Sequence, residues 1–510
     1  MTDALLSVHD AIWGIPMLLL ILGIGIGLTY ATGYAQITLF PRALAVFFRK
    51  FRSRNPHREG VSPFRALCTA LGATVGTGNI IGVAGAICLG GPGSIFWMWL
   101  CGILGMVTKY AEVTLAVRFR EKQGREYIGG PMYIIRHGLG SKWRGLAVCY
   151  CFFGVVAAFG VGNTVQINAV ISGIRDVMMR YGMRGCQSYD LAFGLILSVL
   201  IGAVLLGGAK RIGSAAEILV PVVSAGYILL CCGVLLRRAG AVPAALCSIV
   251  RGAFSPEAVT GGVIGSVFQA LRIGCSRGVF TNEAGMGTAS IAHASAETSQ
   301  PAEQGLMGIM EVFLDTIVLC TMTALVILTS GIPVPYGVDV SGSLTAQAFA
   351  CVYGDWVSVV LTIALCCFAV ATVLGWGLYG LRCAQFLFGQ QVEELYALLQ
   401  TAAVVIGAVV ETQTVWLISG LLNGLMAIPN LIALALLAPE LVRLTKEYTN
   451  IKGGIAANGG TYANLDQCKP LRAFSHEKIS SLCDGGGEKR KEDLSSQYRS
   501  AGSSDAPCVL

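Results

Sequence analysis

The stretch Ala70-Leu-Gly-Ala-Thr-Val-Gly-Thr-Gly-Asn-Ile-Ile-Gly82 lies inside an apolar segment long enough to cross a membrane. A packing face of small residues explains Gly72 and Gly76, which are four residues apart. It does not explain Gly78, because positions 76 and 78 do not share a helix face. The stretch therefore predicts a helix that unwinds in its middle. A bilayer tolerates such exposed backbone only where it lines a cavity or binds something.

A second stretch with the same character is Gly278-Val-Phe-Thr-Asn-Glu-Ala-Gly-Met-Gly-Thr288. Gly285 and Gly287 again interrupt an apolar segment, here beside the carboxylate of Glu283. An ionised side chain at this depth is costly and is a functional candidate by default. The alternative is an ion pair with Arg272 or Arg277 that only locks helices together. Two glycine-broken segments in corresponding positions of two halves indicate a transporter built from inverted repeats.

The composition supports a membrane protein. The chain has 510 residues, of which 54% are hydrophobic and only 13% are charged, whereas a soluble protein carries roughly 25% charged residues. We therefore expect an all-α integral membrane protein with about eleven transmembrane helices. The hydrophobic segments span about 12–32, 64–89, 93–117, 145–174, 190–208, 212–236, 260–292, 306–331, 355–378, 393–411 and 414–437.

Basic residues in the loops predict the orientation. With the first terminus outside, the internal gaps hold seventeen Lys and Arg residues and the external gaps hold six. The sequence thus predicts an external N-terminus and, with an odd number of spans, a cytoplasmic C-terminus. Residues 439–510 are rich in Gly, Ser, Lys and Glu, a composition typical of disorder. We expect them to form a disordered cytoplasmic tail.

Several classes of function are disfavoured. The net charge of +7 forms no basic stripe that would bind nucleic acid. The eighteen cysteines form no CxxC pair and the five histidines form no HExxH motif, so a zinc enzyme is not expected. A channel would need a symmetric pore-lining repeat, and a membrane enzyme would need a nucleophile–base pair or a metal set. The sequence displays neither, and we expect a transporter rather than an enzyme.

Ordered motifs along the chain resemble the alanine or glycine:cation symporter family from about residue 12 to 440. The motifs are Gly76-Thr-Gly-Asn-Ile80, Gly90-Gly-Pro-Gly-Ser-Ile-Phe-Trp97, Lys109-Tyr-Ala-Glu112, Gly129-Gly-Pro-Met-Tyr133, Thr281-Asn-Glu-Ala-Gly285 and Gly375-Trp376. This family is similar in fold to the bacterial leucine transporter. The resemblance implies a ten-helix inverted-repeat core with two broken helices and one extra N-terminal helix.

The resemblance also divides the chain. Residues 1–438 would form the transporter domain, in which 12–32 is the extra helix, 64–236 the first repeat and 260–437 the second. It implies that Na⁺ drives the uptake of alanine or glycine in a multi-pass protein of the plasma membrane (the inner membrane of a bacterium). The partners would be the amino acid, the sodium ion and the lipid bilayer, with no cofactor beyond the transported ion. The oligomeric state and the choice among alanine, glycine and serine stay open.

Substrate contacts are carried over to matching positions. The resemblance implies that the free N–H groups of Thr77 and Gly78 meet the carboxylate of the cargo, where the dipoles of the broken helix favour an anion. Gln166 would hydrogen-bond the substrate, while Phe280 and Trp376 would wall off a pocket too small for long side chains. Taken alone, Gln166 is equally explained by an interhelical hydrogen bond, and Trp376 by an anchor at the membrane interface.

The family resemblance also implies two sodium sites. One would lie near the carbonyl of Thr74, the side chain of Asn79, and Thr281. The other would use carbonyl groups and one hydroxyl, from Gly72, Val75, Ala369 and Thr372. The family usually has Ser or Thr beside Thr372, where this chain has Ala371, so the second site would have fewer oxygen ligands.

The sequence also leaves a different coupling ion open. Glu283 or Asp315 could carry a proton instead of sodium, which would make the protein a proton-coupled symporter of small amino acids. Glu112 is a further carboxylate within a predicted span. Lys109 precedes it by three residues and can pair with it on one helix face.

The predicted orientation can be tested directly. A cysteine placed in 50–58 of a cysteine-depleted chain should react with membrane-impermeant reagents only after cells are permeabilised. A cysteine at residue 3 should react in intact cells, and one at residue 470 should not. Labelling of 50–58 from outside intact cells would contradict the orientation.

Overall fold

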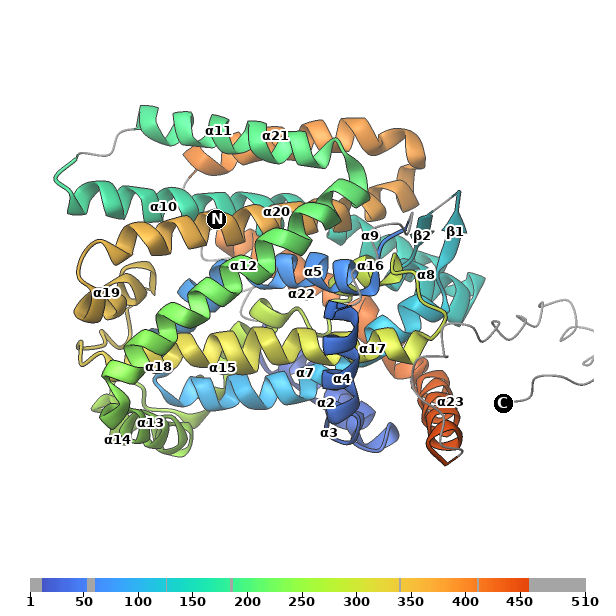
Figure 1. Cartoon of the computed structure of the whole chain (residues 1–510), viewed down its shortest axis with the longest axis horizontal. Helices are drawn as coiled ribbons and strands as arrows, with labels where there is room; N and C mark the ends of the chain where they lie inside the picture. The colour runs from blue at the N-terminus through green and yellow to red at the C-terminus, as the bar shows by residue number, and fades with distance from the viewer. Residues whose placement is uncertain are drawn as a thin grey trace, which may run out of the picture. The chain divides into compact units, whose positions relative to one another are not determined.

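Long apolar helices run side by side through the computed structural model, which describes residues 12–52, 60–124, 126–183, 187–338, 341–410 and 412–457. Figure 1 shows these helices drawn roughly parallel, with shorter helices at both ends of the bundle. The strands β1 and β2 and the helix α8 lie at one end, whereas α13, α14 and α19 lie at the other. This separation agrees with the predicted alternation of internal and external loops.

The first half of the described chain contains one extra helix, a broken helix and four long helical segments. Its elements are α2 (Ile15–Ala31), α3 (Ala35–Thr38), α4 (Phe40–Arg52), α5 (Pro63–Thr74), η1 (Gly78–Gly82), α6 (Val83–Gly90), α7 (Gly93–Arg118), β1 (Glu121–Gln123), β2 (Glu126–Ile128), α8 (Pro131–Tyr133), η2 (Ile134–Leu139), η3 (Ser141–Trp143), α9 (Arg144–Phe159), η4 (Gly160–Thr164), α10 (Val165–Arg180), α11 (Gln187–Leu205) and α12 (Gly208–Arg237).

The second half again places a broken helix before its long helices. Its elements are η5 (Ala239–Ala241), α13 (Val242–Phe254), α14 (Pro256–Thr260), α15 (Val267–Asn282), α16 (Thr288–Ala294), α17 (Pro301–Val312), η6 (Phe313–Cys320), α18 (Thr321–Thr329), α19 (Ser341–Tyr353), α20 (Val357–Phe388), η7 (Gln390–Val392), α21 (Glu393–Val409), α22 (Thr412–Leu436) and α23 (Ala438–Ala457).

The all-helical membrane fold is confirmed, but the count of eleven spans is not. Among the described residues, seven helices are long and apolar enough to cross a membrane, or nine if each of two bent pairs counts as one span. The predicted first span is the shorter helix α2, with 17 residues. The predicted span 260–292 is divided into α15 and α16, so neither piece alone has the length of a span.

The first predicted break is present. Helix α5 ends at Thr74, because Val75 leaves the helical region with φ −75° and ψ 99°. The chain resumes as the π-helical segment η1 at Gly78. The two halves, Pro63–Thr74 and Gly78–Gly90, are bent by 51°. The polar and glycine residues quoted from the sequence therefore lie in and beside an unwound segment.

The second predicted break is also present. Helix α15 ends at Asn282, and Glu283 follows with the left-handed φ of 53°. Gly285 and Gly287 are also left-handed, with φ of 96° and 77°, and α16 begins after them. Residues other than glycine rarely adopt this backbone conformation, so the backbone at Glu283 is strained.

Packing brings the two breaks together. Helix α7 packs along α15 and α17, α20 packs on both α5 and α9, and η1 contacts α15. In Figure 1, α11 and α21 lie together along one side of the bundle and α12 crosses it diagonally. The site region thus lies between α5, α10, α15 and α20, away from the ends of the spans.

The expected disordered tail from residue 439 is wrong for its first part. Residues Ala438–Ala457 form α23, which belongs to the same compact unit as the spans. Leu441, Leu444 and Tyr448 are buried on one face of it, and the hydroxyl groups of Tyr110 and Thr445 are 3.0 Å apart. The average composition of 439–510 obscured this short apolar stripe. Residues 458–510 lie outside the described part of the chain.

Hydropathy misses several helices in the connections. Helices α4, α13 and α19 have 13 residues each, which is too short to cross the hydrocarbon core. They are found only from the structure.

Candidate functional site

The predicted substrate residues surround a small cavity between the first break and α10, α15 and α20. The cavity has a volume of about 10 Å³, which is room for about one water molecule. All five predicted substrate residues line it, together with two predicted cation ligands and four further residues. The lining consists of Thr77, Gly78, Gln166, Phe280, Trp376, Thr74, Thr372, Ala73, Gly76, Val161 and Glu283.

Gln166 connects the first break to α10. The hydroxyl of Thr77 donates to Oε1 of Gln166 at 3.0 Å. Nε2 of Gln166 donates to the carbonyl of Val161 at 3.1 Å, within the π-helical segment η4. These contacts include the interhelical hydrogen bond that the sequence left as an alternative, and they also hold the amide at the cavity wall.

Two glycines of the first break allow close approach of neighbouring helices. A Cβ atom at position 76 would lie 2.7 Å from Oγ1 of Thr372 on α20. A Cβ atom at position 78 would lie 2.9 Å from Cγ2 of Thr281 on α15. Both distances are too short for a real Cβ atom, so only glycine fits without a shift of these neighbours.

Trp376 is not an interfacial anchor. It lies within α20, far from either helix end, and is only 1% exposed. Its indole Nε1 donates to Oε1 of Glu283 at 2.7 Å. The tryptophan therefore joins α20 to the second break while its ring lines the cavity.

Both oxygens of Glu283 have donors. Oε1 accepts from Trp376, and Oε2 accepts from the hydroxyl of Thr288 at 2.5 Å. Thr288 is the first residue of α16. The carboxylate thus ties the left-handed turn to the helix that follows it and to α20, which gives this buried group a defined position beside the cavity.

The predicted ligands of the second cation lie where α5 meets α20. The hydroxyl of Thr372 donates to the carbonyl oxygens of Gly72, at 3.0 Å, and of Phe368, at 3.1 Å. Ala371 also faces Gly72, because a Cβ atom on the glycine would lie 3.4 Å from that of Ala371. Val75, the residue directly after α5, and Ala369 of α20 are also buried. Their role as sodium ligands stays a prediction.

Of the three predicted ligands of the first cation, Asn79 contacts Asp315, which the sequence analysis did not include in this site. Oδ1 of Asn79 accepts the N–H of Gly76 at 3.0 Å, and Nδ2 donates to Oδ1 of Asp315 at 2.6 Å. The hydroxyl groups of Thr74 and Thr281 bond to carbonyl groups of their own helices. The structure therefore adds a buried carboxylate from η6 to this group of oxygens.

Glu112 is a site residue whose role the sequence did not reveal. Its Oε1 accepts the N–H groups of Gly285, at 2.8 Å, and Gly287, at 3.0 Å. The side chain of Asn430 donates to the same oxygen at 2.8 Å. A carboxylate within a span is a visible signal, but no local pattern links position 112 to a break 173 residues later.

The expected pairing of Lys109 with Glu112 is wrong. Nζ of Lys109 lies 3.3 Å from Oε1 of Glu311, and both side chains are fully buried. Oε2 of Glu311 lies 3.0 Å from Nε2 of His293, whose Nδ1 is 2.8 Å from Nε2 of Gln304. This network joins α7, α16 and α17 beside the second break.

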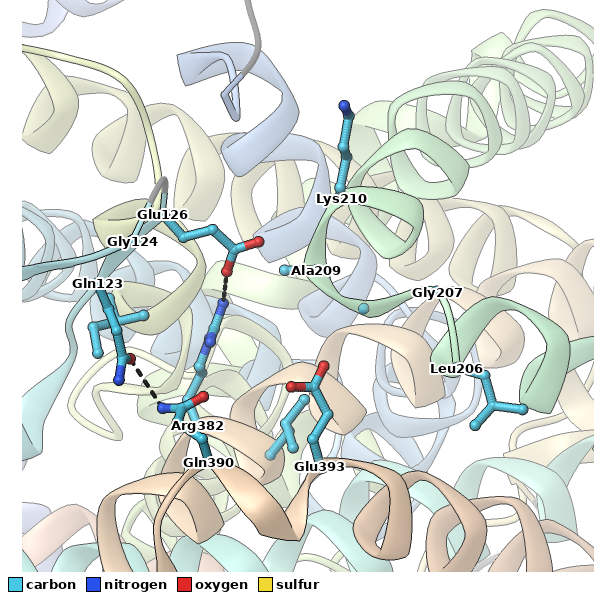
Figure 2. Close-up of a pocket in the computed structure, with 13 residues that line it drawn as sticks. Gln123, Gly124, Glu126, Leu206, Gly207, Ala209, Lys210, Arg382, Gln390 and Glu393 are labelled. Carbon is cyan, nitrogen blue, oxygen red and sulfur yellow. Dashed lines mark hydrogen bonds and ion pairs between the residues drawn. The ribbon is translucent and has the colours of Figure 1, made fainter.

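A larger pocket of about 490 Å³ lies elsewhere, at the end of the bundle near β1 and β2. Figure 2 shows Arg382 reaching Glu126, which it contacts at 2.6 Å, while Lys210 points away from the other labelled side chains. Gln390 donates to Gln123 across the same region at 2.9 Å. The lining includes none of the predicted site residues. We therefore assign the site from its chemistry and not from cavity size.

Comparison with known proteins gives a family and a fold. Residues 1–457 match the family described as the sodium:alanine symporter family. The sodium/alanine symporter AgcS of Methanococcus maripaludis is 42% identical over 457 residues, which cover 89% of this chain and 98% of AgcS. The probable sodium/glutamine symporter GlnT of Bacillus subtilis is 36% identical over 87% of this chain and 90% of its own length.

Comparison with a solved structure supports the fold of this chain and not its function. MhsT, crystallised in complex with L-phenylalanine, resembles this chain with a TM-score of 0.52 and 15% sequence identity. The match covers 76% of this chain and 99% of MhsT. MhsT has the fold of the bacterial leucine transporter, which agrees with the two breaks described above.

Glu112 should be essential for the second break. Replacement by alanine removes the acceptor of two glycine N–H groups and one amide, and each buried charge-assisted hydrogen bond contributes roughly 1.5–3 kcal/mol. We expect Glu112→Ala to lower the unfolding temperature of the purified protein by several degrees and Glu112→Gln to lower it less.

The matched control is Glu126→Gln, which removes the charge of a half-exposed carboxylate that pairs with Arg382. Such pairs contribute about 1 kcal/mol or less, so its unfolding temperature should stay near that of the wild type. Equal unfolding temperatures for wild type and Glu112→Ala would show that the carboxylate does not support the break.

Proposed function

Because the chain belongs to the sodium:alanine symporter family, we propose that it couples the inward movement of Na⁺ to the uptake of a small neutral amino acid, alanine or glycine. Transport would proceed by alternating access within the multi-pass membrane fold. The chain is a transporter and not an enzyme. Its location in the plasma membrane, with the N-terminus outside, is part of the same proposal.

The observation that carries this proposal is the set of residues around the water-sized cavity at the first break, which would have to move apart to admit an amino acid. Thr77 and Gly78 lie at the cavity wall, where the N-terminal end of η1 favours the carboxylate of an amino acid. The amide of Gln166, which accepts a hydrogen bond from Thr77, supplies a further polar group to the lining. Phe280 and Trp376 add bulky apolar walls, which favour a cargo with a small side chain.

Oxygen-rich groups beside the cavity support sodium as the coupling ion. Thr372 and the carbonyl of Gly72 join α20 to α5, and Asn79 with Asp315 joins η1 to η6. Hard cations prefer such carbonyl, hydroxyl, amide and carboxylate oxygens. A cation held at either position would bridge two helices, and its binding would thereby be coupled to the arrangement of the site.

The identity of the cargo and that of the coupling ion go beyond what family membership gives. A relative in the same family is named a probable sodium/glutamine symporter, so family membership does not select alanine or glycine. Proton coupling through Glu283 or Asp315 is the alternative for the ion. Both carboxylates are buried close to the proposed site.

Uptake into liposomes tests both parts. Purified protein should accumulate labelled alanine or glycine when Na⁺ is imposed outside, and should not when choline replaces Na⁺. Glutamine and serine are measured in the same panel. Accumulation driven by a pH gradient in choline would favour the proton alternative, and uptake of glutamine but not alanine or glycine would contradict the proposed cargo.

The second cation position gives a sharper prediction. Thr372→Ala removes the hydroxyl that faces Gly72, whereas Thr372→Ser keeps it. Loss of a charge-assisted contact of roughly 1.5–3 kcal/mol corresponds to about a ten- to hundredfold change. We expect Thr372→Ala to raise the Na⁺ concentration for half-maximal uptake by that factor, and Thr372→Ser to leave it nearly unchanged.

Two further variants extend this test. Asn79→Ala should also raise the half-maximal Na⁺ concentration, because it removes the amide beside Asp315. Ala371→Ser adds a hydroxyl facing Gly72 and should lower that concentration. Normal uptake with unchanged sodium dependence in both alanine variants would show that the cations bind elsewhere.

A further inference from the structure

The surface of helix α4 has three faces of different character. Ala43 and Val46 are buried against the bundle. Leu44, Phe48 and Phe51 repeat at helical spacing on a second face and are 37%, 50% and 46% exposed.

The third face of α4 is basic. Arg42, Arg49 and Arg52 are separated by seven and three residues, which places them on one flank of the helix. The helix contains no acidic residue. Arg42 and Arg52 are exposed, while Arg49 is 37% exposed at its side chain and contacts Glu303 of α17 at 2.7 Å.

The orientation of α4 differs from that of the spans. Figure 1 shows it crossing α17 steeply, and the two helices are in contact. Lys50 also lies 3.2 Å from Glu303, the third residue of α17. The helix therefore lies across the beginning of a membrane-spanning segment and does not continue along it.

Contacts with α5 indicate how deep α4 lies in the membrane. The rings of Phe47 and Phe51 pack on that of Phe64, with centroids 6.3 and 5.3 Å away. Phe64 is the second residue of α5, whose other end is the break at Thr74. At 1.5 Å per residue the break lies about 15 Å from Phe64. If the break is at mid-membrane, this is the edge of a hydrocarbon core about 30 Å thick.

We propose that α4 is an interfacial helix that binds anionic phospholipid, with its apolar face among the acyl chains and its arginine face on the phosphate groups. Helices that lie in a membrane interface combine these two faces, and anionic lipids of the cytoplasmic leaflet attract basic segments. This location agrees with the predicted cytoplasmic side of the segment between the first two predicted spans, 12–32 and 64–89. The proposal adds a lipid site to the transporter and is independent of its cargo.

Lipid binding to the full-length protein tests the proposal. Detergent-purified protein is titrated with phosphatidylglycerol or with phosphatidylcholine, and bound lipids are counted by native mass spectrometry. A basic residue at a membrane surface strengthens binding by about fivefold. We therefore expect the double variant Arg42→Gln, Arg52→Gln to bind phosphatidylglycerol roughly 20- to 30-fold more weakly, with phosphatidylcholine binding unchanged.

The matched control removes two arginines from the same end of the molecule, Arg136→Gln and Arg443→Gln. Arg136 lies 3.7 Å from Glu121, and Arg443 is 2.7 Å from Glu440, so both already have acidic partners. The control should bind phosphatidylglycerol as the wild type does. Equal binding by the wild type and the Arg42, Arg52 variant would overturn the proposal.

A photo-crosslinking amino acid in place of Phe48 identifies the occupant of the apolar face. In reconstituted membranes it should form an adduct of one protein chain with one phospholipid. A crosslinked dimer would assign this face to a second copy of the chain and would overturn the proposal. Unfolding temperatures of the variants near that of the wild type show that they fold, so weaker phosphatidylglycerol binding by the Arg42, Arg52 variant alone supports the proposal.

Discussion

Unwound backbone in a membrane needs partners for its N–H and C=O groups, and this structure supplies them with side chains. Glu112 accepts two glycine N–H groups of the second break on one oxygen. In the first break, Asn79 accepts the N–H of Gly76. Unsatisfied groups at this depth would each cost several kcal/mol. These polar side chains thus maintain the two breaks beside the site.

The side chains that satisfy the backbone need donors in turn, and these come from other helices. Asn430 of α22 donates to Glu112, and Trp376 of α20 donates to Glu283. Lys109 pairs with Glu311 in a fully buried contact. A buried charge without a partner is strongly destabilising, so each carboxylate fixes the relative positions of at least two helices. The second break becomes the point at which α7, α16, α20 and α22 meet.

Local chemistry could be predicted from the sequence, whereas long-range pairing could not. Glycines beside polar residues in an apolar segment predicted both breaks, and the family resemblance supplied five residues that line one cavity. The partners of Glu112 lie more than 170 residues away, and Lys109 had a plausible neighbour in its own helix. The composition of 439–510 concealed α23, because a few buried side chains such as Leu441 are lost in the average. Only tertiary structure provides these contacts.

The left-handed residues of the second break have a mechanical consequence. Glu283, Gly285 and Gly287 lie between two helices whose own hydrogen-bond ladders end on either side of the loop. Rotation about a few loop dihedrals can therefore change the angle between α15 and α16 without unwinding either. Glu112 and Asn430 contact the loop itself, so a change in this angle would be resisted at the loop by α7 and α22. Because Glu283 lines the cavity and also bonds to Thr288 at the start of α16, any such change would reach the cavity wall through this one side chain.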